Sequence, residues 1–249
     1  MKYLIFSDEC GVWNEGDYYI RSWIKLTPEN YILLKKEVIF SKHETGVKEL
    51  KWDKFIRNIK KFKEIFSVDF SIFITITKPQ HFQSTKYNIV SEISAVPAST
   101  GGEALTNKIK TKIINSAKNE LFFNYFEKTH IETSKNALVG NENSQEYEYC
   151  IDAPQYLDRE WKNIAKDCGI KNISIEKKSE NNPGIETSDV ISGCIMDFLL
   201  NNSDCSKNIY NSLIKSKMCN MRSKKYPNPN LVFYRDFSDK EKQKIDVFR

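Results

Sequence analysis

The sequence predicts a mixed α/β domain in which helices flank a sheet, and two observations lead to this fold class. Short apolar or alternating segments over residues 2–8, 69–77 and 146–152 have the pattern of buried strands. Longer segments between them have the spacing of amphipathic helices. Two strands come first and strands alternate with helices later, which indicates a sheet with both antiparallel and parallel pairs. The 249 residues suffice for one such domain with its own hydrophobic core.

The first third of the chain contains two strands, two helices and a third strand. The predicted elements are, in order, a strand over residues 2–8, a strand over 18–26, a helix from 28 to about 40, a helix over 52–66 and a strand over 69–77. The first two strands are expected to form a hairpin, because turn residues separate them. Thr27 and Pro28 suit the N-cap and the first turn of the helix that follows.

The rest of the chain alternates helices and strands. The predicted elements are a long helix over residues 103–127, a strand over 146–152, a helix over 155–167, a strand over 171–177, helices over 186–200 and 203–221, and a closing strand over 231–234. No internal repeat and no clean linker divides the chain. We therefore expect a single domain over residues 1–249, with a helical insertion around 81–140.

The composition of the chain argues against several classes of protein. The six cysteines include no C-x-x-C pair, and three histidines are too few for a rich zinc site. We expect a cytoplasmic protein with reduced thiols and no membrane partner, because the chain shows no signal peptide and no apolar run as long as a membrane span. The formal net charge of +5 permits a nucleic-acid partner without demonstrating one.

Three acidic residues stand near the ends of predicted elements. Asp8 and Asp152 close two strands, and Asp189 lies on the helix over 186–200. Strand ends and helix starts meet at one edge of an open α/β sheet, so these carboxylates are expected to come together. Like charges at one place need a cation, and hard oxygen ligands favour Mg²⁺ or Mn²⁺. The alternative is that each acid caps a helix or lies in solvent.

Four short motifs follow one another along the chain. They are Asp8-Glu9-Cys10-Gly11, Glu49-Leu50-Lys51, Tyr149-Cys150-Ile151-Asp152 and the helical Glu186-Thr187-Ser188-Asp189-Val190-Ile191-Ser192-Gly193. In these motifs and their order, most of the chain resembles the prokaryotic family called domain of unknown function 3800, which is assigned to the ribonuclease-H-like group. The family has Ser in place of Cys10, and Gln and Ala in place of Glu186 and Ser188. The resemblance implies a ribonuclease-H-like mixed sheet flanked by helices.

The resemblance also implies a set of metal ligands. In the ribonuclease-H arrangement, carboxylates hold two metal ions about 3.5–4 Å apart across the scissile phosphate. Asp8 is expected to bridge the two ions. Asp152 and Asp189 would complete the site, with Glu49 as a fourth ligand. Glu9 is less suitable, because neighbouring strand residues point to opposite faces of a sheet.

Basic residues are the candidates for contacts with nucleic acid. Lys51 is expected to contact phosphate in preference to pairing near Glu49. Lys224 and Lys225 form a basic run beside Tyr226, an aromatic residue that could stack on a base. The ordinary explanation of such a run is a solvated surface.

Three further polar residues are expected to be structural or solvated. Asp197 follows Asp189 by two helical turns. His43 and His130 lack the neighbours that would make them catalytic, so we expect them in loops or on the surface.

The leading hypothesis is a metal-dependent nuclease that acts on RNA, DNA or a hybrid. The alternative is a nucleic-acid or protein binding module that has kept the fold and lost catalysis. A third hypothesis, a phosphotransfer enzyme with an aspartyl nucleophile, is disfavoured because residues 8–10 do not supply Asp-x-Asp. Fold class alone does not decide among them.

Overall fold

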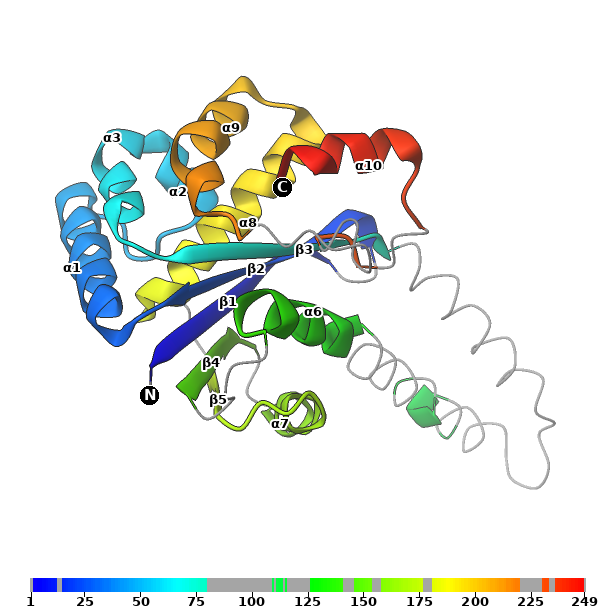
Figure 1. Cartoon of the computed structure of the whole chain (residues 1–249). Helices are drawn as coiled ribbons and strands as arrows, with labels where there is room; N and C mark the ends of the chain where they lie inside the picture. The colour runs from blue at the N-terminus through cyan, green and yellow to red at the C-terminus, as the bar shows by residue number, and fades with distance from the viewer. Residues whose placement is uncertain are drawn as a thin grey trace.

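The sheet is the centre of the fold. The computed structural model describes residues 2–12, 15–79, 109, 111–113, 115, 126–140, 146–153, 158–176, 181–219, 230–232 and 236–248. Within these residues the sheet has five strands in the order β3-β2-β1-β4-β5 (Figure 1). The strands are β1 (Tyr3–Val12), β2 (Glu15–Leu26), β3 (Ser71–Thr77), β4 (Tyr147–Asp152) and β5 (Ile173–Glu176).

The sheet is mixed, as the sequence predicted. β1 and β2 form an antiparallel hairpin, and β3 pairs antiparallel with the other side of β2. On its far side β1 pairs parallel with β4, and β4 pairs parallel with β5. Because β1 and β4 run in the same direction, the residues near Asp8 and Asp152 lie at the same edge of the sheet.

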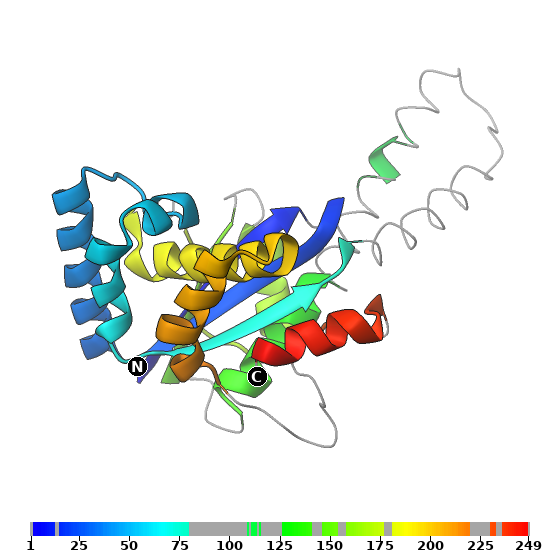
Figure 2. The same ribbon diagram turned by 90° about the horizontal axis from the view of Figure 1, so that it is seen from above.

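Helices cover both faces of the sheet (Figures 1 and 2). The α-helices within the described residues are α1 (Pro28–Thr45), α2 (Trp52–Arg57), α3 (Ile59–Phe62), α6 (Lys128–Leu138), α7 (Asp158–Asp167), α8 (Pro183–Asn201), α9 (Asp204–Ile209) and α10 (Asp239–Ile245). The long helix α8 packs on β1 and β2, and α1, α2 and α9 pack on α8. On the other face, α6 packs on β3 and α7 packs against β5.

The alternation of side chains along the strands divides the core into two parts. Phe6 of β1 and Cys150 of β4 belong to the hydrophobic cluster on the α8 face. Ile5, Tyr149 and Ile151 belong to the cluster on the α6 and α7 face. Residues two apart on a strand share a face, so Asp8 and Asp152 fall on the α8 face.

Several helix boundaries differ from the prediction for local reasons. α1 continues to Thr45 and ends where Gly46 adopts the left-handed conformation, with a φ of 67°. The single helix predicted over 52–66 is divided into α2, α3 and a 3₁₀ turn over Lys63–Ser67, because Asn58 leaves the helical region with a φ of −124°. The predicted closing strand over 231–234 is wrong in its described part, where Leu231 forms only an isolated bridge with Ile76.

The prediction for His130 is wrong. This residue lies on α6 with a fully buried side chain. Its ring nitrogens lie 2.6 Å from Thr75 Oγ1 and 2.9 Å from Thr77 Oγ1. The imidazole fits inside the protein because both of its nitrogens have hydroxyl partners, and burial keeps its pKa well below the usual value.

Within the range 81–140, where a helical insertion was predicted, Phe126, Ile131, Leu138 and Val139 are buried in the core. Most of residues 81–125, including most of the helix predicted over 103–127, fall outside the described residues. Among the described residues, no helix combines the length and the apolar composition needed to cross a membrane. All six cysteines are described, and none of them forms a disulfide.

Candidate metal centre

Asp8 and Asp152 lie side by side on adjacent parallel strands. The register pairs Ser7 with Ile151, so the next residues along the strands, Asp8 and Asp152, stand opposite each other. Both fall on the α8 face. Asp8 is buried, with 7% of its surface exposed, and its Oδ1 accepts a hydrogen bond of 2.8 Å from the backbone N–H of Glu9. Asp152 is half-buried at the end of β4.

Asp189 reaches the same place from α8, because this helix is fixed closely against the hairpin. Ser22 Oγ donates a hydrogen bond of 2.6 Å to the carbonyl of Ser188, and Ser188 Oγ donates one of 3.4 Å to the carbonyl of Phe6. Gly184 permits the close approach, since a Cβ at this position would lie 2.3 Å from the ring of Phe6. Asp189 is therefore the residue next to Ser188, which contacts β1 directly.

The three carboxylates influence one another through their charges. Burial, followed by the charges of Glu9, Asp189 and Asp152, raises the pKa of Asp8 to about 9. Burial raises the pKa of Asp189 to about 7, and Asp152 contributes to this shift. Burial raises the pKa of Asp152 to about 6. Like charges near one another titrate together, and a cation would return all three carboxyl groups to their charged forms.

Glu49 and Lys51 lie at the edge of this group. Lys51 Nζ is 3.5 Å from Glu49 Oε1. Partial burial lowers the pKa of Lys51, but the charges of Glu49, Asp189 and Asp8 outweigh it, and the net shift is upward. Pairing of Lys51 near Glu49 was the alternative that the sequence left open, and it is possible because these residues lie in a bend before α2 and not on a strand. The phosphate contact stays a prediction.

The buried carboxylate of Glu186 holds the bend between Glu49 and Lys51 in place. Glu186 is 1% exposed and lies one turn before Asp189 on α8. Its Oε2 accepts a hydrogen bond of 2.9 Å from the backbone N–H of Leu50, and its Oε1 accepts one of 2.7 Å from Lys42 Nζ. The same helix thus carries Asp189 and fixes the segment that carries Glu49. The sequence feature that could have indicated this role is the acidic Glu186 in the first turn of a helix whose other residues are mostly apolar.

A second contact fixes the same segment from its C-terminal side. Trp52, the first residue of α2, packs on α8 at Gly193, where a Cβ would lie 2.5 Å from Trp52 Cβ. Only glycine leaves room for the indole at this position. This contact explains, in physical terms, the Gly at the end of the helical motif.

Two substitutions of Glu186 are expected to distinguish the contribution of its backbone hydrogen bond to stability from the contribution of its charge. Glu186→Ala leaves the N–H of Leu50 and the ammonium of Lys42 without this acceptor, and should lower the free energy of unfolding by about 2–3 kcal/mol. Glu186→Gln keeps an acceptor for Leu50 and should cost about 1 kcal/mol. Urea unfolding of both variants measures the difference. Equal losses for Ala and Gln would show that the charge matters and the backbone hydrogen bond does not.

Glu9 faces the other side of the sheet, as predicted. Its Oε2 lies 2.7 Å from Arg21 Nη2, and the Arg21 guanidinium is buried with 1% of its surface exposed. Arg21 Nη2 also donates to Glu127 Oε1 at 3.2 Å, while Arg21 Nε lies 3.2 Å from Glu127 Oε2 without hydrogen-bond geometry. Tyr19 OH donates a hydrogen bond of 2.6 Å to Glu127 Oε1. The sequence did not predict this network, which ties the backbone next to Asp8 to α6.

Cys10 does not act as a thiolate in this structure. Burial, together with the charges of Asp189 and Asp8, raises the pKa of Cys10 to about 11. The thiol therefore keeps its proton at neutral pH and is a poor nucleophile and a poor metal ligand. The carboxylates therefore remain the candidate donor set at this place.

The remaining candidates do not join the group. Asp197 accepts a hydrogen bond of 2.7 Å from Asn201 Nδ2 on the exposed side of α8, in keeping with a structural or solvated role. Lys224, Lys225 and Tyr226 lie outside the described residues. Within the part of the chain that the structure describes, no three Asp, Glu, His or Cys side chains are already arranged to hold a metal ion.

Comparison with known proteins gives no family for this chain. No protein-family model matches it, and a search of curated proteins finds no match. The resemblance to the family called domain of unknown function 3800 therefore rests on the four motifs alone.

Proposed function

We propose that the chain is a metal-dependent nuclease that hydrolyses phosphodiester bonds of RNA, DNA or a hybrid. One observation carries the proposal: Asp8, Asp152 and Asp189 come from β1, β4 and α8, and each has a pKa that burial and acidic neighbours raise. Carboxyl groups whose pKa values are raised by burial and by one another's charges are candidates for a functional site. The cytoplasm, where its unpaired cysteines stay reduced, is the compartment that we propose for its action.

The donor set fits Mg²⁺ or Mn²⁺, which prefer carboxylate oxygens. Asp8, Asp152 and Asp189 would hold the metal, with Glu49 as a further ligand, and the half-buried side chains of Asp152 and Asp189 would turn toward Asp8 to close the site. Bound there, a divalent ion would supply charge stabilisation for phosphoryl transfer. Lys51 would release part of its interaction with the carboxylates and offer its ammonium to a phosphate oxygen.

The strand arrangement supports the proposal at the level of the fold. Within the described residues, β2 is the one strand of the order β3-β2-β1-β4-β5 that runs antiparallel to its neighbours, and a mixed sheet flanked by helices is what the ribonuclease-H-like resemblance implies. A fold shared by many proteins does not by itself specify an activity. The functional argument rests on the carboxylates of Asp8 within β1, Asp152 at the end of β4 and Asp189 on α8.

The experiment is a cleavage assay with labelled single-stranded RNA, duplex DNA and an RNA–DNA hybrid. Each substrate is incubated with the full chain in Mg²⁺, in Mn²⁺ and in chelator. We expect cleavage of at least one substrate in one of the metals and none in chelator. Absence of cleavage under all conditions, together with no Mn²⁺ binding in a calorimetric titration, would refute the proposal.

One observation favours the binding module as the second candidate. The carboxylates interact through their charges, yet in the described residues they are not already closed around a point that a metal could occupy. A binding module would retain nucleic acid in chelator and show no cleavage in either metal. Fluorescence anisotropy with the same labelled substrates separates this outcome from a nuclease.

A further inference from the structure

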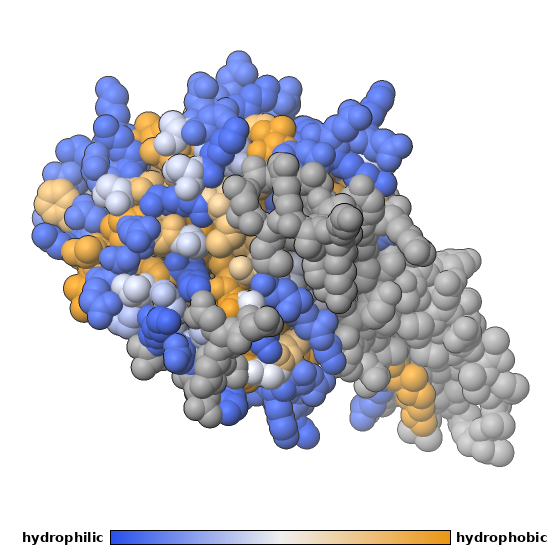
Figure 3. All heavy atoms as spheres, in the orientation of Figure 1, coloured by the Kyte–Doolittle hydropathy of each residue, from blue (hydrophilic) through white to orange (hydrophobic). Residues whose placement is uncertain are grey.

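Helix α1 carries an exposed apolar stripe. Its inner side is buried through Leu34, Val38 and Ser41. On its outer side four large hydrophobic residues are more than half exposed: Ile32 at 67%, Leu33 at 51%, Ile39 at 52% and Phe40 at 56%. Figure 3 shows hydrophobic spheres among hydrophilic ones at the margin where α1 lies. Single exposed hydrophobic residues are ordinary, but four on one helix face indicate a surface that binds a partner.

The stripe is symmetric about Lys36. Ile32 and Phe40 stand four residues to either side of it, and Leu33 and Ile39 stand three residues to either side. In an antiparallel pair of identical helices that crosses at this point, Ile32 lies beside Ile39 of the second copy, and Leu33 lies beside Phe40 of the second copy. Such self-complementarity is the property of an interface between two copies related by a twofold axis.

We propose that α1 is a homodimerisation surface that packs antiparallel on α1 of a second copy of this chain. This proposal does not depend on the proposed nuclease function. In both views of the fold, α1 lies at one margin of the molecule with its outer side turned away from the sheet (Figures 1 and 2). A second copy can therefore approach without a change in the fold.

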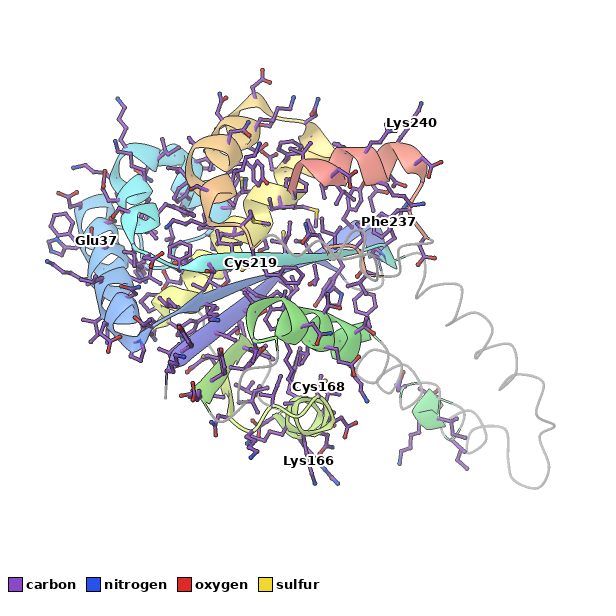
Figure 4. The ribbon with its side chains drawn as sticks, in the orientation of Figure 1. Glu37, Lys166, Cys168, Cys219, Phe237 and Lys240 are labelled. Atoms are coloured by element: carbon purple, nitrogen blue, oxygen red, sulfur yellow. The ribbon has the colours of Figure 1, made fainter. Side chains whose placement is uncertain are left out.

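The charges around the stripe also suit a second copy. Glu37, labelled on α1 in Figure 4, follows Lys36 and falls beside Lys36 of the second copy in the antiparallel arrangement. Glu29 near one end of α1 faces His43 near the other end of the second helix. The twofold axis also brings the two Lys36 side chains together at the crossing point, where Glu37 of each copy offsets the charge of Lys36 of the other.

The strength of the dimer follows from its size. A standard stable interface buries about 800 Å² on each partner, and a contact through one face of one helix is smaller. We therefore expect a weak dimer with a Kd on the order of micromolar. Its population will change with protein concentration over the range accessible to sedimentation experiments.

Sedimentation velocity of the full chain at increasing concentration tests the dimer. We expect a reversible shift from monomer to dimer in the wild type. Leu33→Glu and Phe40→Glu should each raise the Kd at least about tenfold, because each buries a charge in the apolar contact. Leu200→Glu is the matched control: Leu200 is 48% exposed at the end of α8 and should leave the Kd unchanged. A wild-type protein that stays monomeric, or a dimer that tolerates both α1 variants, would overturn the proposal.

Charge exchange and crosslinking test the antiparallel arrangement. Lys36→Glu and Glu37→Lys should each weaken the dimer, and the double variant should restore it. In a Cys205→Ser background, Glu29→Cys and His43→Cys should form little disulfide-linked dimer alone and a linked heterodimer when mixed. Efficient crosslinking of each variant with itself would indicate parallel helices and overturn the proposal. So would a monomer that binds phosphatidylserine vesicles through Phe40.

Discussion

Asp8→Asn is expected to remove nearly all metal-dependent cleavage. Asp8 is the most buried of the three carboxylates, and its pKa is raised the most, to about 9. Its side chain is directed to the face where Asp152 and Asp189 lie. Loss of an outer-shell partner of a metal ligand already costs about 10–100-fold in affinity or activity, so loss of the central ligand should cost at least about a hundredfold.

Asp189→Asn should have a similar effect, because α8 presents Asp189 to the same carboxylates. Asp197→Asn is the matched control on the same helix. Asp197 is two turns away and its carboxylate accepts a hydrogen bond from Asn201, so its replacement should reduce the rate by less than about twofold. All three substitutions replace Asp by Asn, so any difference in rate among the variants reflects the position of the residue.

The measurement is the initial rate of cleavage at saturating Mn²⁺ for the wild type and each variant. Circular dichroism confirms that each variant is folded. A rate for Asp8→Asn equal to that of the wild type would refute the assignment of the site. Equal losses of cleavage rate for Asp189→Asn and Asp197→Asn would indicate that any loss of charge on α8 lowers activity and that Asp189 is not a metal ligand.

The parts of the fold that could be predicted depend on local patterns. The alternating residues over 69–77 correspond to β3. The apolar run over 2–8 corresponds to the first part of β1, but the prediction that Asp8 closes this strand was wrong, because pairing with β2 continues to Val12. The three acids could be proposed as a group because parallel strands bring their carboxyl ends to one edge, a rule that needs no side-chain detail. Secondary structure therefore follows from residues close together in the sequence, and the candidate site follows from the rule for strand ends.

The parts that could not be predicted depend on pairs of residues far apart in the chain. Arg21 and Glu127 are separated by 106 residues, and nothing near either residue indicates the other. Glu186 is paired with Leu50 across 136 residues. The burial of His130 likewise requires Thr75 and Thr77, which lie on a strand that precedes it by more than 50 residues. Such pairs are set by tertiary packing, which the local pattern does not encode.

The dependence of stability on pH and on metal separates a metal site from a structural ion pair within the same protein. The folded protein keeps a proton on Asp8 up to about pH 9, whereas the unfolded chain loses it near the usual value of 3.8. Between these limits the folded state binds more protons, so in chelator the contribution of Asp8 to stability falls as the pH rises. The raised pKa values of Asp152 and Asp189 act in the same direction up to about pH 6 and 7.

Asp8→Asn removes the free-energy cost of keeping this buried carboxyl group protonated at neutral pH. In chelator at neutral pH, the variant should be as stable as the wild type or more stable, and its stability should depend less on pH. Millimolar Mn²⁺ should then stabilise the wild type more than the variant, since the ion binds only the folded state. Thermal melts in chelator and in Mn²⁺, each at several pH values, measure both effects.

Glu127→Ala should behave in the opposite way. Its carboxylate is fully buried between Arg21 and Tyr19, and its removal leaves the buried guanidinium with Glu9 as its remaining carboxylate partner. Breaking a buried ion pair costs about 3–5 kcal/mol, and here the loss should be the same with and without Mn²⁺ because the pair lies on the far face of the sheet. If Asp8→Asn instead destabilises the chelated protein as much as Glu127→Ala does, and Mn²⁺ leaves the melting of the wild type unchanged, then Asp8 is a structural acid and the metal site does not exist.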